Sequence, residues 1–160
     1  MKVLWIVNML LPDAAEYLGV KTGFSGTWMI NMSREIANSG DVELAIACVY
    51  GDEFKDFTVN NIRYFCIPGN GKTMLFYNEK LIKYWDIIEE RFNADIVNFH
   101  GTEYSHGVSY LRKYKDKKKV LTIQGVMAKI SPERCGELPL SVLLRYRTIK
   151  EWLHFNGMLE

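Results

Sequence analysis

Short apolar segments alternate along the chain with longer stretches in which apolar residues recur every three or four positions. The apolar segments are rich in β-branched and aromatic residues, which is typical of strands buried on both faces of a sheet. They predict five strands, at residues 2–8, 42–50, 62–68, 95–99 and 119–125. The turn-rich residues 51–61 leave room for a short edge strand between the second and the third.

Helical periodicity occurs in four of the other stretches, at residues 27–40, 78–92, 105–114 and 138–155. In the first of these, Trp28, Met32 and Ile36 share one face, with Met29 and Ile30 flanking it. Gly40 then ends the helix, as glycine commonly does. In the second, the apolar face is formed by Leu81, Tyr84, Trp85, Ile88 and Phe92. The alternation of strands and helices predicts an α/β fold built on a parallel sheet.

Length and charge limit the size and the partners of the protein. A chain of 160 residues is long enough for one domain with a hydrophobic core and too short to predict two. The 20 basic and 19 acidic residues nearly cancel, to a formal net charge of +1. We therefore expect no nucleic-acid partner, because no long-range field attracts one. The basic run at residues 113–119 is interpreted as a solvated helix end.

Cysteine usage and the lack of targeting segments indicate the compartment. Cys48 and Cys66 lie inside apolar runs, and the chain has no Cys-x-x-Cys pair, which favours buried free thiols in a reducing compartment. The apolar start is interrupted at Pro12 and Asp13, and no cleavage site for a secretory signal follows. No segment approaches the roughly 18 apolar residues that a membrane span needs. We expect a soluble, cytoplasmic protein.

Two glycine-containing loops are candidates for phosphate binding. Residues 69–73, GNGKT, lack the first glycine of a P-loop because Cys66 occupies its position, so a plain strand-to-helix turn is expected there. Residues 23–27, GFSGT, follow the first strand and enter a helix. Backbone amides and the helix N-terminus favour an anion in such a loop. Equally, Ser25 or Thr27 could merely cap the helix, and the pattern leaves both interpretations open.

The stretch NFHGTEYSHG, residues 98–107, contains two of the three histidines. His100 follows one strand and Gln124 ends the next, so both are expected at the carboxyl edge of the sheet, where ligands bind. Glu103 lies in the connecting loop, and His106 lies near the start of the next helix. The spacing is not that of a zinc site. We expect a cleft without a metal, with hydrogen-bonded structural histidines as the alternative.

The order of these segments resembles a known family. Three stretches carry the likeness, namely KVLWIVNMLLP, GFSGTWMINMSREIANSGDVELAIA and ADIVNFHGTEYSHGVSYLRKYKDKKKVLTIQG. Together they look like the N-terminal half of a retaining glycosyltransferase of the GT-B fold, glycosyltransferase family 4. The resemblance implies a Rossmann-like parallel sheet flanked by helices. The chain stops after a helical stretch with no strand to follow, so residues 1–160 are expected to be one truncated acceptor-side domain whose C-terminal donor-binding domain is absent.

The resemblance also implies an activity and roles for particular residues. Such enzymes transfer a sugar from a nucleotide sugar, UDP- or GDP-linked, to a glycan or lipid-linked acceptor, and need no metal or other cofactor. The residues implied near the donor diphosphate are Gly23, Ser25, Gly26 and Thr27. The residues implied on the acceptor side of the cleft are His100, Glu103, His106 and Gln124. No catalytic base can be assigned, because the missing half supplies much of the site.

One position departs from the family pattern. Many members carry a histidine where this chain has Gln124. Glutamine can orient a hydroxyl or carbonyl group but cannot become cationic, so only the location is carried over. By analogy alone, the basic run and an apolar loop suggest peripheral contact with the inner face of a membrane that holds a lipid-linked acceptor.

Two other functions remain open at this point. The first is a stand-alone Rossmann- or flavodoxin-like domain that binds a nucleotide or phosphate through residues 23–27. The second is a non-catalytic module in which residues 98–107 recognise a carbohydrate or a partner protein. Nucleotide binding by residues 1–160 alone would distinguish the first from a glycosyltransferase domain.

Overall fold

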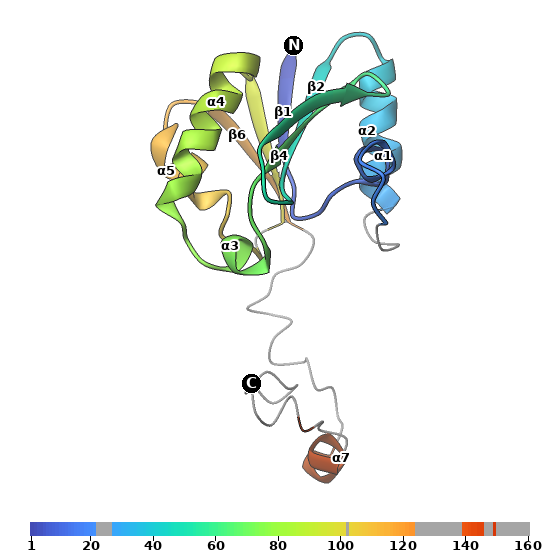
Figure 1. Cartoon of the computed structure of the whole chain (residues 1–160), viewed down its shortest axis with the longest axis vertical. Helices are drawn as coiled ribbons and strands as arrows, with labels where there is room; N and C mark the ends of the chain where they lie inside the picture. The colour runs from blue at the N-terminus through green and yellow to red at the C-terminus, as the bar shows by residue number, and fades with distance from the viewer. Residues whose placement is uncertain (22–26, 102, 124–138, 146–148, 150–160) are drawn as a thin grey trace. The chain divides into compact units, whose positions relative to one another are not determined.

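The computed structural model describes residues 1–21, 27–101, 103–123, 139–145 and 149. The chain divides into two compact units, Met1–Ile123 and Gln124–Glu160. The first unit is a sheet with helices on both faces (Figure 1). In the second unit the structure describes helix α7, Leu140–Arg145. No helix in the described part of the chain is long and apolar enough to cross a membrane.

Six strands form the sheet of the first unit. They are β1 (Lys2–Ile6), β2 (Glu43–Val49), β3 (Lys55–Val59), β4 (Ile62–Ile67), β5 (Ile96–His100) and β6 (Lys118–Thr122). Their order in space is β3-β4-β2-β1-β5-β6. All neighbours are parallel except β3 and β4, which form an antiparallel hairpin. The predicted α/β class is therefore confirmed, and the sheet is Rossmann-like.

Helices cover both faces of this sheet (Figure 1). On one face lie α1 (Pro12–Tyr17) and α2 (Thr27–Asn38). On the other face lie α4 (Ile82–Phe92) and α5 (Val108–Lys113). The short α3 (Gly71–Leu75) and the 3₁₀ helix η1 (Glu79–Leu81) lead into α4. The sheet is thus the middle of three layers.

Alternation along the buried strands divides the core into two halves. In β1, Leu4 and Ile6 point into the half that α4 covers, whereas Trp5 points into the half that α2 covers. Successive side chains of a strand point to opposite faces, so an entirely apolar strand serves both halves. Cys48 and Cys66 lie opposite each other in β2 and β4, and both are buried and free. The prediction of buried free thiols at these two positions is confirmed.

The predicted elements agree closely with the structure, although part of the helical stretch expected at residues 138–155 lies outside the described residues. Each expected strand is present within three residues of its predicted bounds, and the edge strand allowed between the second and third is β3. Residues 69–73 form the expected strand-to-helix turn, in which the Asn70 side chain accepts hydrogen bonds from the amides of Lys72 and Thr73. The short helices α1 and α3 were not predicted. Pro12 begins α1 at a position where proline suits a helix, because no amide hydrogen is needed there.

The predicted apolar face of α2 was correct for Met32 and Ile36 and wrong for Trp28. Met29 is fully buried, whereas Trp28 is 40% exposed. The rotation of the helix is set by its packing on the sheet, and that packing selects Met29, with Met32 and Ile36 partly buried beside it. Trp28 instead places its ring on His100, with the ring centroids 5.4 Å apart. For the 78–92 helix the prediction was correct. Its fully buried side chains are Leu81, Trp85, Ile88 and Phe92.

Candidate functional site at the carboxyl edge of the sheet

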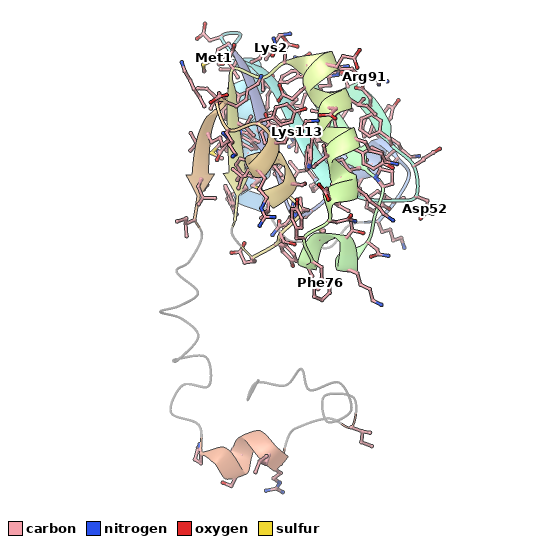
Figure 2. The ribbon with its side chains drawn as sticks, turned by 90° about the vertical axis from the view of Figure 1, so that its left-hand side faces the viewer. Met1, Lys2, Asp52, Phe76, Arg91 and Lys113 are labelled. Carbon is pink, nitrogen blue, oxygen red and sulfur yellow. The ribbon has the colours of Figure 1, made fainter. Side chains whose placement is uncertain are left out.

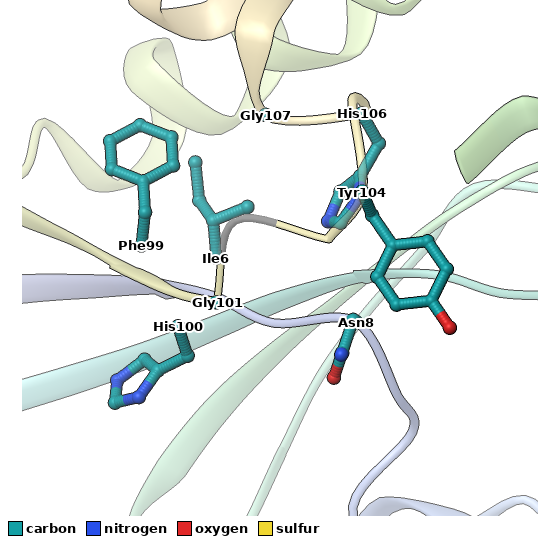
Figure 3. A pocket seen from close by; sticks show the side chains of 8 residues that line it. All are labelled: Ile6, Asn8, Phe99, His100, Gly101, Tyr104, His106 and Gly107. Carbon is teal, nitrogen blue, oxygen red and sulfur yellow. The ribbon is translucent and has the colours of Figure 1, made fainter. Parts of the chain in front are cut away.

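The direction in which successive strands are added to the sheet reverses at β1. After β1 the chain adds β2, β4 and β3 on one side, and it then returns to add β5 and β6 on the other. Such a switch point leaves a crevice outside the carboxyl ends of the two strands, where open α/β sheets bind ligands. A hollow of about 20 Å³ lies there, with room for about one water molecule. It is lined by Ile6, Asn8, Phe99, His100, Gly101, Tyr104, His106 and Gly107 (Figure 3).

His100 is the last residue of β5, and only 3% of its surface is exposed. Its ring packs on Trp5 and Trp28, with centroid distances of 4.4 and 5.4 Å. Its Nε2 lies 3.1 Å from the side-chain nitrogen of Asn98. Burial lowers the pKa of His100 to about 4, so the ring is neutral at neutral pH. Its Nδ1 has no hydrogen-bond partner among the described residues.

His106 lies just before α5 and is 4% exposed. Its Nε2 is 3.1 Å from the carbonyl oxygen of Val7. A carbonyl oxygen only accepts, so Nε2 carries the proton and Nδ1 is a bare acceptor. Burial lowers the pKa of His106, and the hydrogen bond to Val7 opposes this shift only in part. This ring is therefore also neutral, and its Nδ1 likewise lacks a partner within the described part of the chain.

The two unpartnered nitrogens distinguish this edge from the rest of the described structure. Buried polar groups are nearly always hydrogen-bonded, and leaving one unsatisfied costs about 1–3 kcal/mol. Among the side chains of the described residues, Nδ1 of His100 and Nδ1 of His106 are the buried polar atoms without a partner. The two rings lie on either side of the backbone at Gly101 (Figure 3). This edge of the sheet therefore carries one neutral, incompletely bonded ring on each side, that of His106 on the side of Ile6 and Phe99 and that of His100 against Trp5 and Trp28.

Glu103 lies beside the hollow rather than in it. Its side chain is exposed, and its carboxylate rests against Gly101, where an added Cβ would lie 2.2 Å from Oε2 of Glu103. Gly101 has a φ of 95°, a conformation that favours glycine. The next residue that the loop contributes to the hollow is Tyr104, which is 37% exposed. Of the four expected cleft residues, the structure thus brings His100 and His106 to the hollow and leaves Glu103 at its rim.

The expected diphosphate loop falls largely outside the described residues. Gly23, Ser25 and Gly26 are not among them, and neither is Gln124. Thr27 is the first residue of α2. The ring contact between Trp28 and His100 places the first turn of α2 next to the ring of His100, the last residue of β5. In the described part of the chain, no three His, Cys, Asp or Glu side chains are grouped as a metal site would require.

Sequence reasoning missed Asn8 and the pair formed by Asn98 and Thr122. Asn8 could have been found, because it follows β1 as His100 ends β5, at the carboxyl edge of the sheet. Asn98 and Thr122 are joined by a hydrogen bond of 3.0 Å between β5 and β6. No local pattern shows that bond, because the two residues are 24 positions apart in the chain.

We expect Gly107→Ala to destabilise the protein by about 1–3 kcal/mol, because the added methyl group overpacks the wall of the hollow. A Cβ at Gly107 would lie 2.9 Å from Cδ1 and 3.0 Å from Cε1 of Phe99. Urea unfolding followed by tryptophan fluorescence measures the change. Gly71→Ala is the matched control, because a Cβ there meets no atom within 4 Å. Equal stability of the two variants would show that Phe99 moves aside at no cost.

A comparison of the chain with models of protein families found no match, and a comparison with curated proteins found no match either. The function therefore has to be inferred from the position of the hollow and the chemistry of the residues around it. Two of these residues, His100 and His106, have neutral rings that each leave one nitrogen without a partner among the described residues.

Proposed function

We propose that the chain is the acceptor-side domain of a retaining glycosyltransferase. The whole enzyme transfers a sugar from a UDP- or GDP-linked donor to a glycan or lipid-linked acceptor, without a metal. The resemblance of the sequence stretches 2–12, 23–47 and 94–125 supports this proposal, and so does the Rossmann-like sheet. The observation that carries it is the hollow at the switch point between β1 and β5, with two neutral histidines in its wall.

Neutral histidines suit an uncharged acceptor group. A sugar hydroxyl both donates and accepts hydrogen bonds, so it can satisfy a bare nitrogen such as Nδ1 of His106. A phosphate at neutral pH brings mainly acceptor oxygens and would repel that lone pair. The hollow is too small for a sugar ring. In this proposal one hydroxyl enters it, and the ring lies outside, against the partly exposed Tyr104.

The start of α2 suits the leaving group of the donor. Transfer breaks the bond between the anomeric carbon and the diphosphate oxygen, forms a bond from that carbon to the acceptor oxygen, and passes the proton of the acceptor hydroxyl to the departing diphosphate. Negative charge grows on the departing diphosphate, and the N-terminus of a helix stabilises such charge. Helix α2 has 12 residues and begins at Thr27, beside His100. A second domain supplies the remaining donor contacts, so residues 1–160 alone are inactive.

The test is donor-dependent release of nucleoside diphosphate by the full-length gene product. We expect one nucleotide sugar in a panel to be consumed when a suitable acceptor is present. Gly26→Trp should lower kcat/KM by about tenfold or more, because a bulky ring in the loop before α2 displaces the donor. Ser39→Trp is the matched control, because it adds the same ring just beyond the other end of α2, at an exposed position.

Two outcomes would contradict the proposal. If a folded protein consumes no donor across the panel, transferase chemistry is not supported, and screening residues 1–160 for carbohydrate ligands becomes the next experiment. If residues 1–160 alone bind a nucleotide tightly, without sugar transfer, a stand-alone nucleotide-binding domain replaces the glycosyltransferase. Equal loss of activity in Gly26→Trp and Ser39→Trp would show that the loop before α2 has no special role.

A further inference from the structure

A chain of hydrogen bonds connects β6 to His100. The hydroxyl of Thr122 in β6 donates to the side-chain oxygen of Asn98 in β5, with a length of 3.0 Å. The side-chain nitrogen of Asn98 lies 3.1 Å from Nε2 of His100. All three side chains lie on the same face of the sheet, because Asn98 and His100 are two residues apart in one strand and Thr122 pairs with His100 in the next.

The donor-to-acceptor direction of these hydrogen bonds decides which ring nitrogen of His100 carries the proton. The oxygen of the Asn98 amide is occupied by Thr122, so the amide presents its NH₂ group to the ring. An NH₂ group only donates, so Nε2 of His100 must accept and cannot carry a hydrogen. A neutral imidazole has one hydrogen on nitrogen. That hydrogen is then on Nδ1, the atom that has no partner among the described residues.

We propose that Asn98 and Thr122 are positioning residues, which hold His100 as the tautomer protonated on Nδ1 so that it donates a hydrogen bond to a ligand oxygen at the carboxyl edge of the sheet, on the face where Trp5 and Trp28 lie. His106 is held in the opposite tautomer, because the Val7 carbonyl requires a proton on Nε2. The carboxyl edge then presents one fixed donor and one fixed acceptor, both uncharged, on opposite faces of the sheet. The identity of the ligand rests on the proposed function, whereas the tautomer of His100 does not.

The two tautomers can be measured directly in the free protein. Two-bond ¹H–¹⁵N correlation spectra of residues 1–160 distinguish a protonated from a bare imidazole nitrogen. His100→Gln and His106→Gln assign the signals among the three histidines of the chain. We expect a protonated Nδ1 in His100 and a protonated Nε2 in His106. A protonated Nε2 in His100 would mean that the Asn98 amide is turned the other way, and it would overturn the proposal.

Two variants test the role of the neighbours. Asn98→Asp should move the proton of His100 to Nε2, because a carboxylate only accepts. Asn78→Asp is its control, since it adds the same charge at the distant cap of η1, where either side chain accepts from the Lys80 amide. Thr122→Val removes the hydrogen bond that fixes the orientation of the Asn98 amide, so His100 should populate both tautomers. Thr122→Ser keeps the hydroxyl and should give the wild-type spectrum. Spectra of Thr122→Val that match the wild type would contradict the proposal, even if Asn98→Asp fails to fold.

Kinetics of the full-length gene product separate this inference from the proposed function. If sugar transfer is found, Thr122→Val should lower kcat/KM by about tenfold or more, and Thr122→Ser should recover most of it. If no transfer is found but the spectra behave as expected, the tautomer assignment stands and the glycosyltransferase proposal alone fails. If transfer is found and the spectra of the variants do not change, this inference fails alone.

Discussion

Replacement of Trp85 by alanine should lower the free energy of unfolding by about 3–5 kcal/mol, a large part of the stability of a small domain. Trp85 is fully buried in α4, and its ring meets Tyr110 edge-on at a centroid distance of 5.6 Å. Its indole Nε1 donates to the hydroxyl of Ser109, at 2.8 Å. Truncation therefore removes the packing and also the hydrogen bond. Urea unfolding at neutral pH measures the loss.

Two further variants separate the causes of this effect. Trp85→Phe keeps an aromatic ring in the core but removes the donor to Ser109 together with the smaller part of the indole, so it should cost about 1–2 kcal/mol. Leu75→Ala is the control, because Leu75 is 55% exposed and a change there should stay within about 0.5 kcal/mol. Ser109 also donates to the carbonyl oxygen of His106, at 3.1 Å. If Trp85→Phe were as unstable as Trp85→Ala, the hydrogen bond rather than the packing would dominate.

Asp13→Asn should lower the free energy of unfolding by about 1–3 kcal/mol at neutral pH, with a loss that disappears in acid. Asp13 is 6% exposed and accepts hydrogen bonds from the guanidinium of Arg34 and the amide of Asn60. The hydrogen bonds from Arg34 hold the pKa of Asp13 below its ordinary value, although burial opposes this. The ionised carboxylate therefore ties α1 to α2 and to the turn between β3 and β4.

The sign of the pH dependence follows from the lowered pKa. Because the folded protein binds this proton less tightly than the unfolded chain does, the stabilisation is complete above pH of about 4. It is lost as the pH falls through the lower pKa of the folded state. The difference in unfolding free energy between the wild type and Asp13→Asn should then shrink toward zero. A difference that is the same at neutral and at acid pH would contradict this account. Asp116→Asn, at an exposed position, should change little at either pH.

The strands other than β3 were predictable because each contains a short apolar run. Burial on both faces was wrong for the edge strand β6, in which Val120 and Leu121 are 49% and 51% exposed. The buried face of α2 was harder. Trp28 and Met29 are adjacent and both apolar, and only the packing of the helix on the sheet shows that Met29 is the buried one. The short helices α1 and α3 have five or six residues, too few for a helical period to be recognised.

The candidate site was predictable in position but not in chemistry. His100 was expected at the carboxyl edge because it follows a predicted strand, and it lies there. His106 was expected near a helix start, but its partner Val7 is 99 residues away in the chain. The sequence does not show whether Glu103 lines the cleft, as expected, or lies at its rim, as it does in the structure. A loop residue is placed by contacts that have no periodicity.

By itself, the sequence determined where the strands and the longer helices lie, the order in which they alternate, and which polar residues follow the strands. These properties depend on the spacing of neighbouring residues, which any reader of the chain can count. Only the tertiary structure decided that Trp5 and Trp28 pack on the His100 ring. It also decided that Asn98 is the hydrogen-bond partner of His100 and Val7 that of His106. Burial and hydrogen-bond partners fix the charge and the proton of a histidine, and these come from residues brought together by the fold.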